Sequence, residues 1–259
     1  MIRSFKLSGS LYVVATPIGN LADITRRAGD ILKQVDLIAA EDTRHSRKLL
    51  NYLDISDKTI TYHEHNEEKL TSQLIEKLVK GVSIALISDA GTPLISDPGY
   101  RLVLSAHDAN IPVIPIPGAS AVIAGLSVSG LSCSKFIFEG YLPSKSASRQ
   151  KYLKSLTLEP RTLIFFEAPH RILSLIKDMN IIFGGTRYIT IARELTKMHE
   201  QIIKDTLSNI ESKIETNEIK NKGEFVLILE GNNIDLEKDS EILRINEILV
   251  DKLSPKDAV

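Results

Sequence analysis

The sequence predicts an α/β protein with two domains and a mostly parallel sheet. Short apolar runs of the kind that form strands buried on both faces recur along the chain. Segments with apolar residues at helical spacing separate these runs, and this alternation indicates βαβ units. A chain of 259 residues is also near the upper limit for one hydrophobic core, so two domains are expected.

The first half begins with a strand at 11–15 that leads into a turn. Asp23 is expected to N-cap an amphipathic helix that continues through Leu32. The rest of this half follows the same alternation, and Gly81 is expected to end its longest helix. Strands are predicted at 37–40, 84–87 and 113–116, and helices at 47–52, 67–80 and 98–108.

A break at Pro115, Pro117 and Gly118 marks the expected domain boundary, which gives domains at 1–117 and 118–231. The second half opens with a helix of small residues at 119–128 and is expected to be α/β with more antiparallel pairing. Its strands are predicted at 136–139, 162–167, 188–192, 200–207 and 224–229, the fourth followed by a helix.

Residues 232–259 are expected to form a polar linker and the start of a truncated helical tail. Ile242, Ile245, Leu249 and Leu253 make one apolar stripe, and Ser254 before Pro255 has the pattern of an N-cap and first helical position.

Composition narrows the class of partner. Lys and Arg number 32 against 33 Asp and Glu, so any polyanion must be bound by a local patch. The one cysteine, Cys133, excludes an internal disulfide framework and a cysteine-based metal site, and it fits a reducing cytoplasm. No run of 18 apolar residues occurs, so no membrane-spanning segment is expected.

Four Gly- and Pro-containing loops follow predicted strands at their carboxyl ends, where ligands bind in open α/β sheets. They occupy residues 15–20, 88–99, 117–121 and 166–171. None contains a phosphate-binding glycine motif, which disfavours a nucleotide phosphate cradle. Gly91 is expected to contact the ligand or to adopt a backbone conformation closed to other residues.

These loops and several further motifs resemble the bacterial ribosomal RNA small-subunit methyltransferase I family. The resemblance covers about residues 10–231 in unbroken order and is carried by runs at 14–25, 40–44, 88–99, 117–121, 139–143, 166–171, 192–197 and 222–231. It implies a class III, tetrapyrrole methylase-like fold of two α/β domains, with S-adenosylmethionine in the cleft between them. It also implies 2′-O-methylation of a cytidine in 16S ribosomal RNA of the small subunit, and a homodimer.

Two departures separate the chain from relatives that methylate tetrapyrroles. Those relatives have a glycine-richer first loop and a Gly-Asp-Pro in the second, whereas this chain has Ala15-Thr-Pro-Ile-Gly19 and Gly91-Thr-Pro93. The departures favour RNA as substrate. Two alternatives stay open: a tetrapyrrole C-methyltransferase, and a non-catalytic RNA-binding or ribosome-assembly module.

The expected cofactor site combines an apolar wall from the first loop with polar and small residues of the later motifs. Its residues are Pro17, Ile18, Asp89, Gly91, Thr92, Pro93, Ile95, Ser120, Ala121, Phe166, Ala168, Ala192, Arg193 and Glu224. No metal is expected, and the nearest candidate, His63-Glu-His65, is interpreted as solvated polar surface.

Basic residues in two patches are expected to contact RNA phosphates. They are Arg44, Arg47, Lys48, Lys145, Arg149 and Arg171. Polar residues of the motif loops are the candidate catalytic groups, namely Asp42, Arg44, His170 and Lys197. His170 or Lys197 would take or bias the proton of the ribose hydroxyl, and Arg44 would hold the adjacent phosphate. For each of these four residues, the alternative to a catalytic role is a structural one, such as a salt bridge within the loop.

Overall fold

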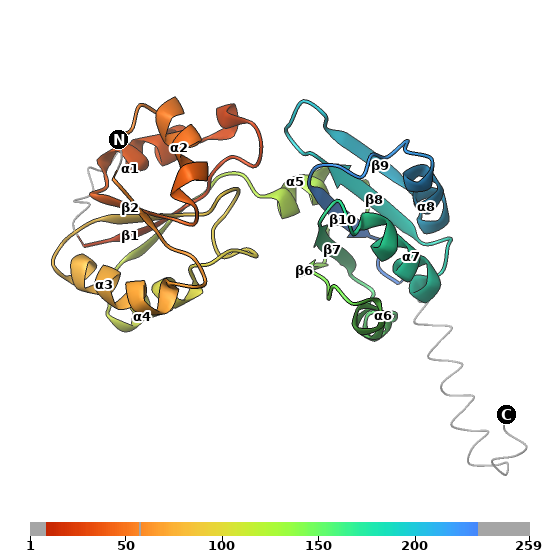
Figure 1. Cartoon of the computed structure of the whole chain (residues 1–259). Coiled ribbons are helices and arrows are strands. Elements are labelled where there is room, and N and C mark those ends of the chain that lie inside the picture. Colours follow the sequence, from red (N-terminus) through yellow and green to blue (C-terminus); the bar gives the residue numbers. More distant parts are fainter. Residues whose placement is uncertain (1–8, 57, 233–259) are drawn as a thin grey trace, which may run out of the picture. The chain divides into compact units, whose positions relative to one another are not determined.

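The computed structural model describes residues 9–56 and 58–232, and its contacts divide them into two compact units (Figure 1). The first unit holds the described chain up to Ser129 together with Ile191–Ile203 and Gly223–Val226. The second holds Gly130–Thr190, Lys204–Lys222 and the described residues from Leu227 onward. The expected boundary after Pro117 stays a prediction, and the tail expected beyond 232 lies outside the described residues.

The first sheet is parallel, and in the described part of the chain it has five strands in the order β3-β2-β4-β1-β5. The strands are β1 (Leu11–Val14), β2 (Leu37–Ala40), β3 (Thr59–Thr61), β4 (Ile84–Ile87) and β5 (Val113–Ile116). All but β3 match the sequence prediction. β3 is a three-residue, half-buried edge strand, which is too short to give a periodic signal.

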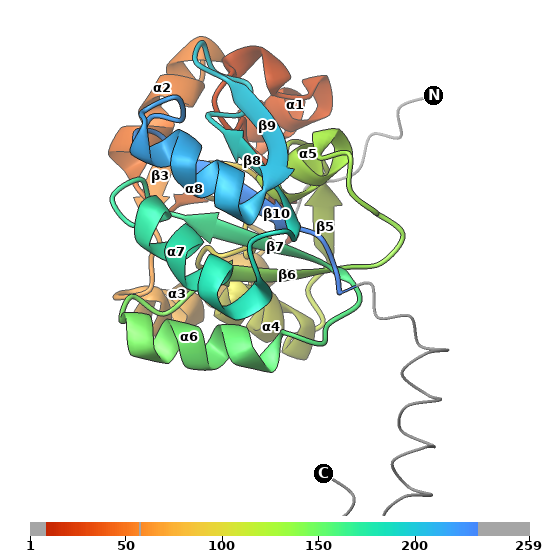
Figure 2. The same ribbon diagram turned by 90° about the vertical axis from the view of Figure 1, so that its right-hand side faces the viewer.

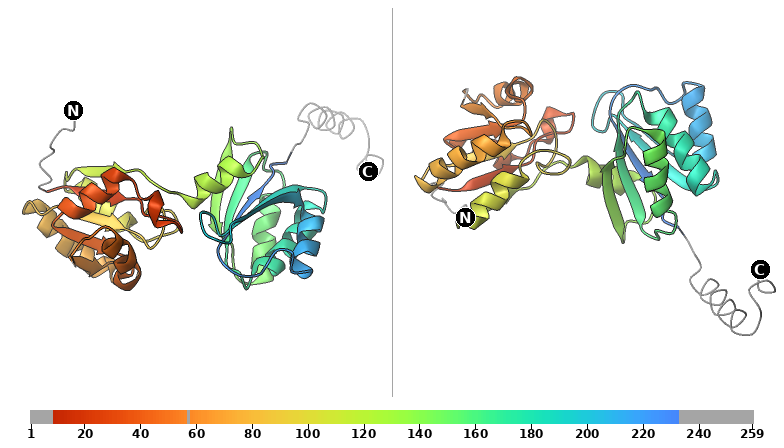
Figure 3. Two further views of the ribbon diagram at one scale, coloured as in Figure 1. Left: turned by 90° about the horizontal axis from the view of Figure 1, so that it is seen from above. Right: turned by 60° about the horizontal axis from the view of Figure 1, so that its bottom comes forward.

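Helices cover both faces of this sheet (Figures 1 and 3). They are α1 (Arg26–Gln34) and α2 (Thr43–Tyr52) on one face, and α3 (Glu67–Val79) and α4 (Tyr100–Asp108) on the other. The strands alternate accordingly: Val14 packs in the α1–α2 core, whereas Leu11 packs in the α3–α4 core. Because the strands are buried on both faces, their sequences are continuous apolar runs.

The starts of α1 and α2 both differ from the sequence prediction. Asp23, the expected cap, is the last residue of a separate 3₁₀ turn (Leu21–Asp23), and α1 begins only after Thr25, whose Oγ1 accepts the Ala28 N–H at 3.1 Å. Asp23 is therefore not the cap, because Ile24 is extended and interrupts the helix. α2 begins four residues before the expected Arg47, because Asp42 caps it by accepting the Arg44 N–H at 2.8 Å.

The strand order places a topological switch between β1 and β4. The chain leaves β1 toward β2 on one side of the sheet and leaves β4 toward β5 on the other, although β1 and β4 are neighbours. Loops that part in this way leave a crevice at the carboxyl ends of the two strands. The first two motif loops, 15–20 and 88–99, both begin there.

The second sheet has the order β6-β7-β10-β8-β9 in the described residues, with β6 and β7 parallel. Its strands are β6 (Phe136–Tyr141), β7 (Thr162–Glu167), β8 (Tyr188–Arg193), β9 (Gln201–Thr206) and β10 (Phe225–Leu229). The Glu194 N–H donates to the Glu224 carbonyl and the Glu230 N–H to the Tyr188 carbonyl. Because the partner numbers run in opposite directions, β8 and β10 are antiparallel, as the sequence predicts for this half.

Four helices lie in the part of the second half that the structure describes. α5 (Ala121–Val128) begins after Ser120, and α6 (Ser146–Ser155), α7 (Ile172–Phe183) and α8 (Leu207–Glu215) pack side by side along the second sheet (Figure 2). No helix in the described residues is both long and apolar enough to cross a membrane.

Candidate active site

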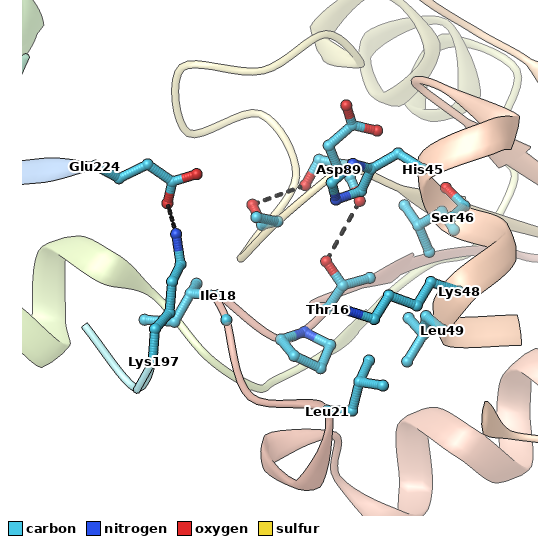
Figure 4. Close-up of a pocket in the computed structure, with 15 residues that line it drawn as sticks. Thr16, Ile18, Leu21, His45, Ser46, Lys48, Leu49, Asp89, Lys197 and Glu224 are labelled. Carbon is cyan, nitrogen blue, oxygen red and sulfur yellow. Dashed lines mark hydrogen bonds and ion pairs between the residues drawn. The ribbon is translucent and has the colours of Figure 1, made fainter. Parts of the chain in front are cut away.

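A pocket of about 280 Å³ lies at the carboxyl ends of β1 and β4, at the topological switch (Figure 4). Pockets that hold small molecules have volumes of ~300–1,000 Å³, so this one is of suitable size for part or all of a cofactor. The residues that line it all belong to the first unit. They are Thr16–Gly19 and Leu21, His45, Ser46, Lys48 and Leu49 of α2, Ile87–Ala90, Lys197 and Glu224.

The two loops at this edge are joined through their backbones. The Thr16 N–H donates to the Gly91 carbonyl at 2.8 Å, and the Gly91 N–H donates to the Thr16 carbonyl at 3.1 Å. Gly91 has φ +81°, and a Cβ there would lie 3.3 Å from Ile18 Cγ2. The expectation that Gly91 holds a conformation closed to other residues is confirmed.

Three carboxyl groups, those of Asp89, Glu41 and Asp97, gather at one wall of the pocket, which Asp89 itself lines. Asp89 accepts the Asp42 N–H at 3.1 Å, and Glu41 accepts the Asp89 N–H at 3.4 Å. Burial raises the pKa of Glu41, with the neighbouring Asp89 charge adding to the effect. Burial also raises the pKa of Asp97 to about 6, and Glu41 and Asp89 contribute there too. This wall therefore favours a positively charged group of a ligand.

Lys197 lines the pocket as a cation. Its Nζ lies 2.8 Å from Glu194 Oε1 and 3.0 Å from Glu224 Oε2. Burial lowers the pKa of Lys197, but hydrogen bonds to the two carboxylates outweigh burial and leave it raised. A protonated amine cannot take a proton, so of the two expected roles this geometry favours biasing the hydroxyl proton through a positive charge, and the catalytic role of Lys197 stays a prediction.

Asp42 and Arg44 form the salt bridge that the sequence offers as the alternative to catalysis. The Arg44 side chain and N–H hydrogen-bond to Asp42 and hold its pKa at about 2. Asp42 is therefore a helix cap and a very weak base. The Arg44 side chain is 87% exposed, so its guanidinium stays accessible to a phosphate.

Several expected cofactor residues lie elsewhere in the first unit. Thr92 Oγ1 donates to the Ala119 carbonyl at 3.1 Å, and Pro93 is buried beside it. Ala192 is fully buried, and Arg193 donates to the His199 carbonyl at 3.2 Å. Ile95, Ser120 and Ala121 also lie outside the lining residues. Among the expected cofactor residues, the pocket brings together Pro17, Ile18, Asp89 and Glu224.

The remaining expected residues belong to the second unit. Phe166 makes edge-on ring contacts with Phe138 and Tyr141, at 4.9 and 5.7 Å between centroids. Ala168 is half-buried and His170 is exposed on the loop that follows β7. Their roles stay predictions.

Two of the expected phosphate contacts are corrected by burial. The Arg149 side chain is 3% exposed, and its Nε donates to Asp178 at 2.6 Å, so it is not available to RNA. Arg171 is mostly buried, paired with Glu167 at 3.1 Å and donating to the Leu142 carbonyl at 2.6 Å. Arg47, Lys48 and Lys145 are exposed, as a phosphate contact requires.

His45, Ser46 and Leu49 are lining residues that sequence reasoning missed as pocket groups, because α2 was expected to begin at Arg47. Asp42 carries the signal that would have found them, since an aspartate three residues before His45 can cap a helix that includes all of them. That earlier start turns the first turns of α2 toward the pocket.

Comparison with known proteins gives one consistent family. The model of the tetrapyrrole (corrin/porphyrin) methylases matches residues 10–211. The chain is 49% identical over 251 residues to ribosomal RNA small subunit methyltransferase I of Xylella fastidiosa (strain Temecula1), a match that covers 96% of this chain and 92% of the relative. It is 52% identical over 225 residues to the Haemophilus influenzae protein of the same name, with 87% and 80% covered.

Solved structures show the same fold at low identity. Uroporphyrin-III-C-methyltransferase from Thermus thermophilus matches with a TM-score of 0.61 at 17% identity, over 89% of this chain and 98% of that one. Diphthine synthase matches with a TM-score of 0.64 at 16% identity, over 85% and 89%. A further Thermus thermophilus uroporphyrin-III C-methyltransferase structure, complexed with S-adenosylhomocysteine, has a TM-score of 0.60 at 17% identity, over 85% and 97%.

Proposed function

Because this chain belongs to the tetrapyrrole methylase family and, within it, to the ribosomal RNA small subunit methyltransferase I proteins, we propose that it 2′-O-methylates a cytidine ribose of 16S ribosomal RNA. The chain is an S-adenosylmethionine-dependent ribosomal RNA methyltransferase. The nucleotide, the 2′-oxygen and the assembled small subunit as substrate are the proposed refinements. We further propose that the enzyme works as a homodimer in the cytoplasm.

The residues of the pocket fit the cofactor. S-adenosylmethionine has a sulfonium and an ammonium group, both positive, and the three carboxyl groups at this wall of the pocket favour positive charge. The Pro17 and Ile18 side chains offer an apolar surface, and the Thr16–Gly91 pairing holds that surface against the second loop. When bound, the cofactor supplies an electrophilic methyl group on sulfur.

The chain's own residues then have to place a ribose hydroxyl in line with that methyl group. Alignment of this kind can supply ~7–11 kcal/mol of the barrier. A ribose hydroxyl is a poor nucleophile at neutral pH, so a nearby cation assists by stabilising the charge that develops on its oxygen. Lys197 is protonated and lines the pocket, which suits it to this role. His170 remains the proposed proton acceptor, and Arg44 the proposed contact for the adjacent phosphate.

The observation that carries the proposal is the pocket at the β1–β4 switch in a chain that is about half identical to these methyltransferases along most of its length. Titration calorimetry with S-adenosylmethionine tests the cofactor. Methyl transfer from labelled S-adenosylmethionine, offered separately to assembled small ribosomal subunits and to a free tetrapyrrole, tests the substrate.

We expect micromolar cofactor binding and label only in the small-subunit RNA. Label in the tetrapyrrole alone would favour the C-methyltransferase alternative. RNA binding without cofactor binding would favour a non-catalytic assembly module.

A further inference from the structure

We propose that Lys197 binds a phosphate of the RNA substrate by exchanging one of its two carboxylate partners, Glu224, while the other, Glu194, remains in place. The inference rests on the proposed function, because it names how the same site recognises RNA. Glu194 acts as a positioning residue and Glu224 as an exchangeable counter-ion.

The two carboxylates hold Lys197 in different ways. The Glu194 side chain is 17% exposed, and its Oε1 accepts both Lys197 Nζ at 2.8 Å and the Glu224 backbone N–H at 2.9 Å. The Glu224 side chain is 75% exposed and meets Lys197 through one contact of 3.0 Å. Exposed ion pairs of this kind contribute little, so Glu224 can be replaced by another anion at small cost.

Close packing fixes the positions of the Glu194 side chain and of the stem of Lys197. A Cβ on Gly223, where φ is +88°, would overlap the Glu194 side chain, so only glycine allows that carboxylate its position. A Cβ on Gly19 would lie 2.5 Å from Lys197 Cγ, so the stem of the lysine runs directly over the first pocket loop. The stem of Lys197 therefore packs against Gly19, and its ammonium group lies beside the Glu224 carboxylate (Figure 4).

Backbone strain marks the same segment. Glu194 has φ +53° and Thr196 has φ +66°, which is a genuine outlier for a β-branched residue. The Thr196 Oγ1 is buried and has no hydrogen-bond partner among the described residues. Strained residues cost free energy and persist where the surroundings determine them, most often at functional sites. The strain here supports a functional placement of Lys197.

The net charge of the three side chains explains why Glu224 has to leave before a phosphate binds. Lys197, Glu194 and Glu224 together carry one net negative charge at neutral pH, which would repel a phosphate. Departure of Glu224 leaves a neutral pair, and the ammonium proton that faced Glu224 becomes free for an oxygen of the incoming phosphate. Glu224 therefore competes with RNA for Lys197.

A double-mutant cycle tests the competition, with small ribosomal subunits as the binding partner and affinity measured over a range of salt concentrations. Glu224→Gln should raise affinity about two- to fivefold, since it removes a weak competing ion pair. Lys197→Met should weaken binding and flatten the salt dependence by about 0.7–0.9 in log–log slope, as expected for one lost phosphate contact. In the Lys197→Met background, Glu224→Gln should bring no gain.

The chain offers a matched control in the second unit. Lys213 lies 3.0 Å from Asp205 and 3.8 Å from Glu218, with the outer carboxylate again the more exposed of the two. Glu218→Gln removes the same charge at a site outside the pocket and should leave RNA affinity within experimental error. An equal gain from Glu218→Gln would mean that net charge alone is responsible, and would overturn the proposal.

The carboxylate of S-adenosylmethionine is another anion that Lys197 could bind. Titration of each variant with S-adenosylmethionine shows whether Lys197 binds the RNA or the cofactor. If Glu224→Gln or Lys197→Met weakened cofactor binding and left the salt slope for RNA unchanged, the exchange would be wrong and both residues would belong to the cofactor. If the wild-type chain binds cofactor and methylates RNA but the cycle shows no coupling, this inference fails alone. If the wild-type chain does neither, the proposed function fails first.

Discussion

Thr16 and Gly91 exchange two backbone hydrogen bonds, at 2.8 and 3.1 Å, and so lock the loop after β1 to the loop after β4. The two loops leave the sheet in opposite directions, and this pairing closes the crevice between them into a wall of the pocket. Ile18, which lines the pocket, lies against Gly91 in that wall. The shape of the proposed cofactor site therefore depends on a position where only glycine fits well.

Gly91→Val should abolish detectable cofactor binding while the protein remains folded. Valine is strained at φ +81°, and its Cβ would press on Ile18 Cγ2 at 3.3 Å, which moves both loops. Gly184→Val is the matched control, because Gly184 has φ +83° and a Cβ there would have no atom within 4 Å. Calorimetry with S-adenosylmethionine measures cofactor binding by both variants, and circular dichroism shows whether they are folded. Normal binding by Gly91→Val would place the cofactor elsewhere.

Asp97→Asn should stabilise the protein at pH 8 but hardly at pH 4. Burial raises the pKa of Asp97 to about 6 from 3.8, so the folded state binds this proton more tightly than the unfolded state. The stability that this provides is complete below about pH 4 and is lost as the pH rises through 6. The amide lacks the charge, and we expect a gain of about 1–2 kcal/mol at pH 8 after allowance for partial exposure.

Urea denaturation at the two pH values measures this difference. Asp108→Asn, at an exposed position of the same unit, serves as the control for a lost surface charge. A gain for Asp97→Asn that is equal at pH 4 and pH 8 would show that ionisation of Asp97 is not its cause.

Arg149→Met should cost about 3–5 kcal/mol of stability and leave the salt dependence of RNA binding unchanged. Removing the guanidinium leaves the buried Asp178 carboxylate with hydrogen bonds from Ser146 and Gln150, which do not neutralise its charge. The double variant Arg149→Met/Asp178→Leu should recover much of the loss. Weaker RNA binding at unchanged stability would restore Arg149 as a phosphate contact.

Arg47→Gln and Lys145→Gln should each weaken RNA binding and flatten its salt dependence by about 0.7–0.9 in slope per lost contact. Both side chains are exposed, and neither lines the pocket, so cofactor affinity should stay the same. Lys177→Gln is the comparison, since it removes one positive charge at a residue that is not among the expected phosphate contacts, and it should matter less. Unchanged slopes would make both residues ordinary solvated surface.

The sequence predicts the parts of this protein that depend on local pattern. Buried strands such as β4 give unbroken apolar runs, and the Gly and Pro loops after them lie where the crevice forms. Helix starts are less predictable, because Asp23 and Thr25 are both good caps and only the extended Ile24 decides between them. Tertiary partners cannot be predicted in this way: nothing local distinguishes the buried Arg149 from the exposed Lys145.

The position of the transferred methyl group is the most direct test of the proposed function. Small ribosomal subunits that lack this modification are incubated with the enzyme and labelled S-adenosylmethionine, and the 16S RNA is then digested to nucleosides and to mapped fragments. We predict one labelled nucleoside, 2′-O-methylcytidine, from one site, and no label with the Gly91→Val variant. Label on a base, or on the ribose of another nucleoside, would contradict the proposed reaction.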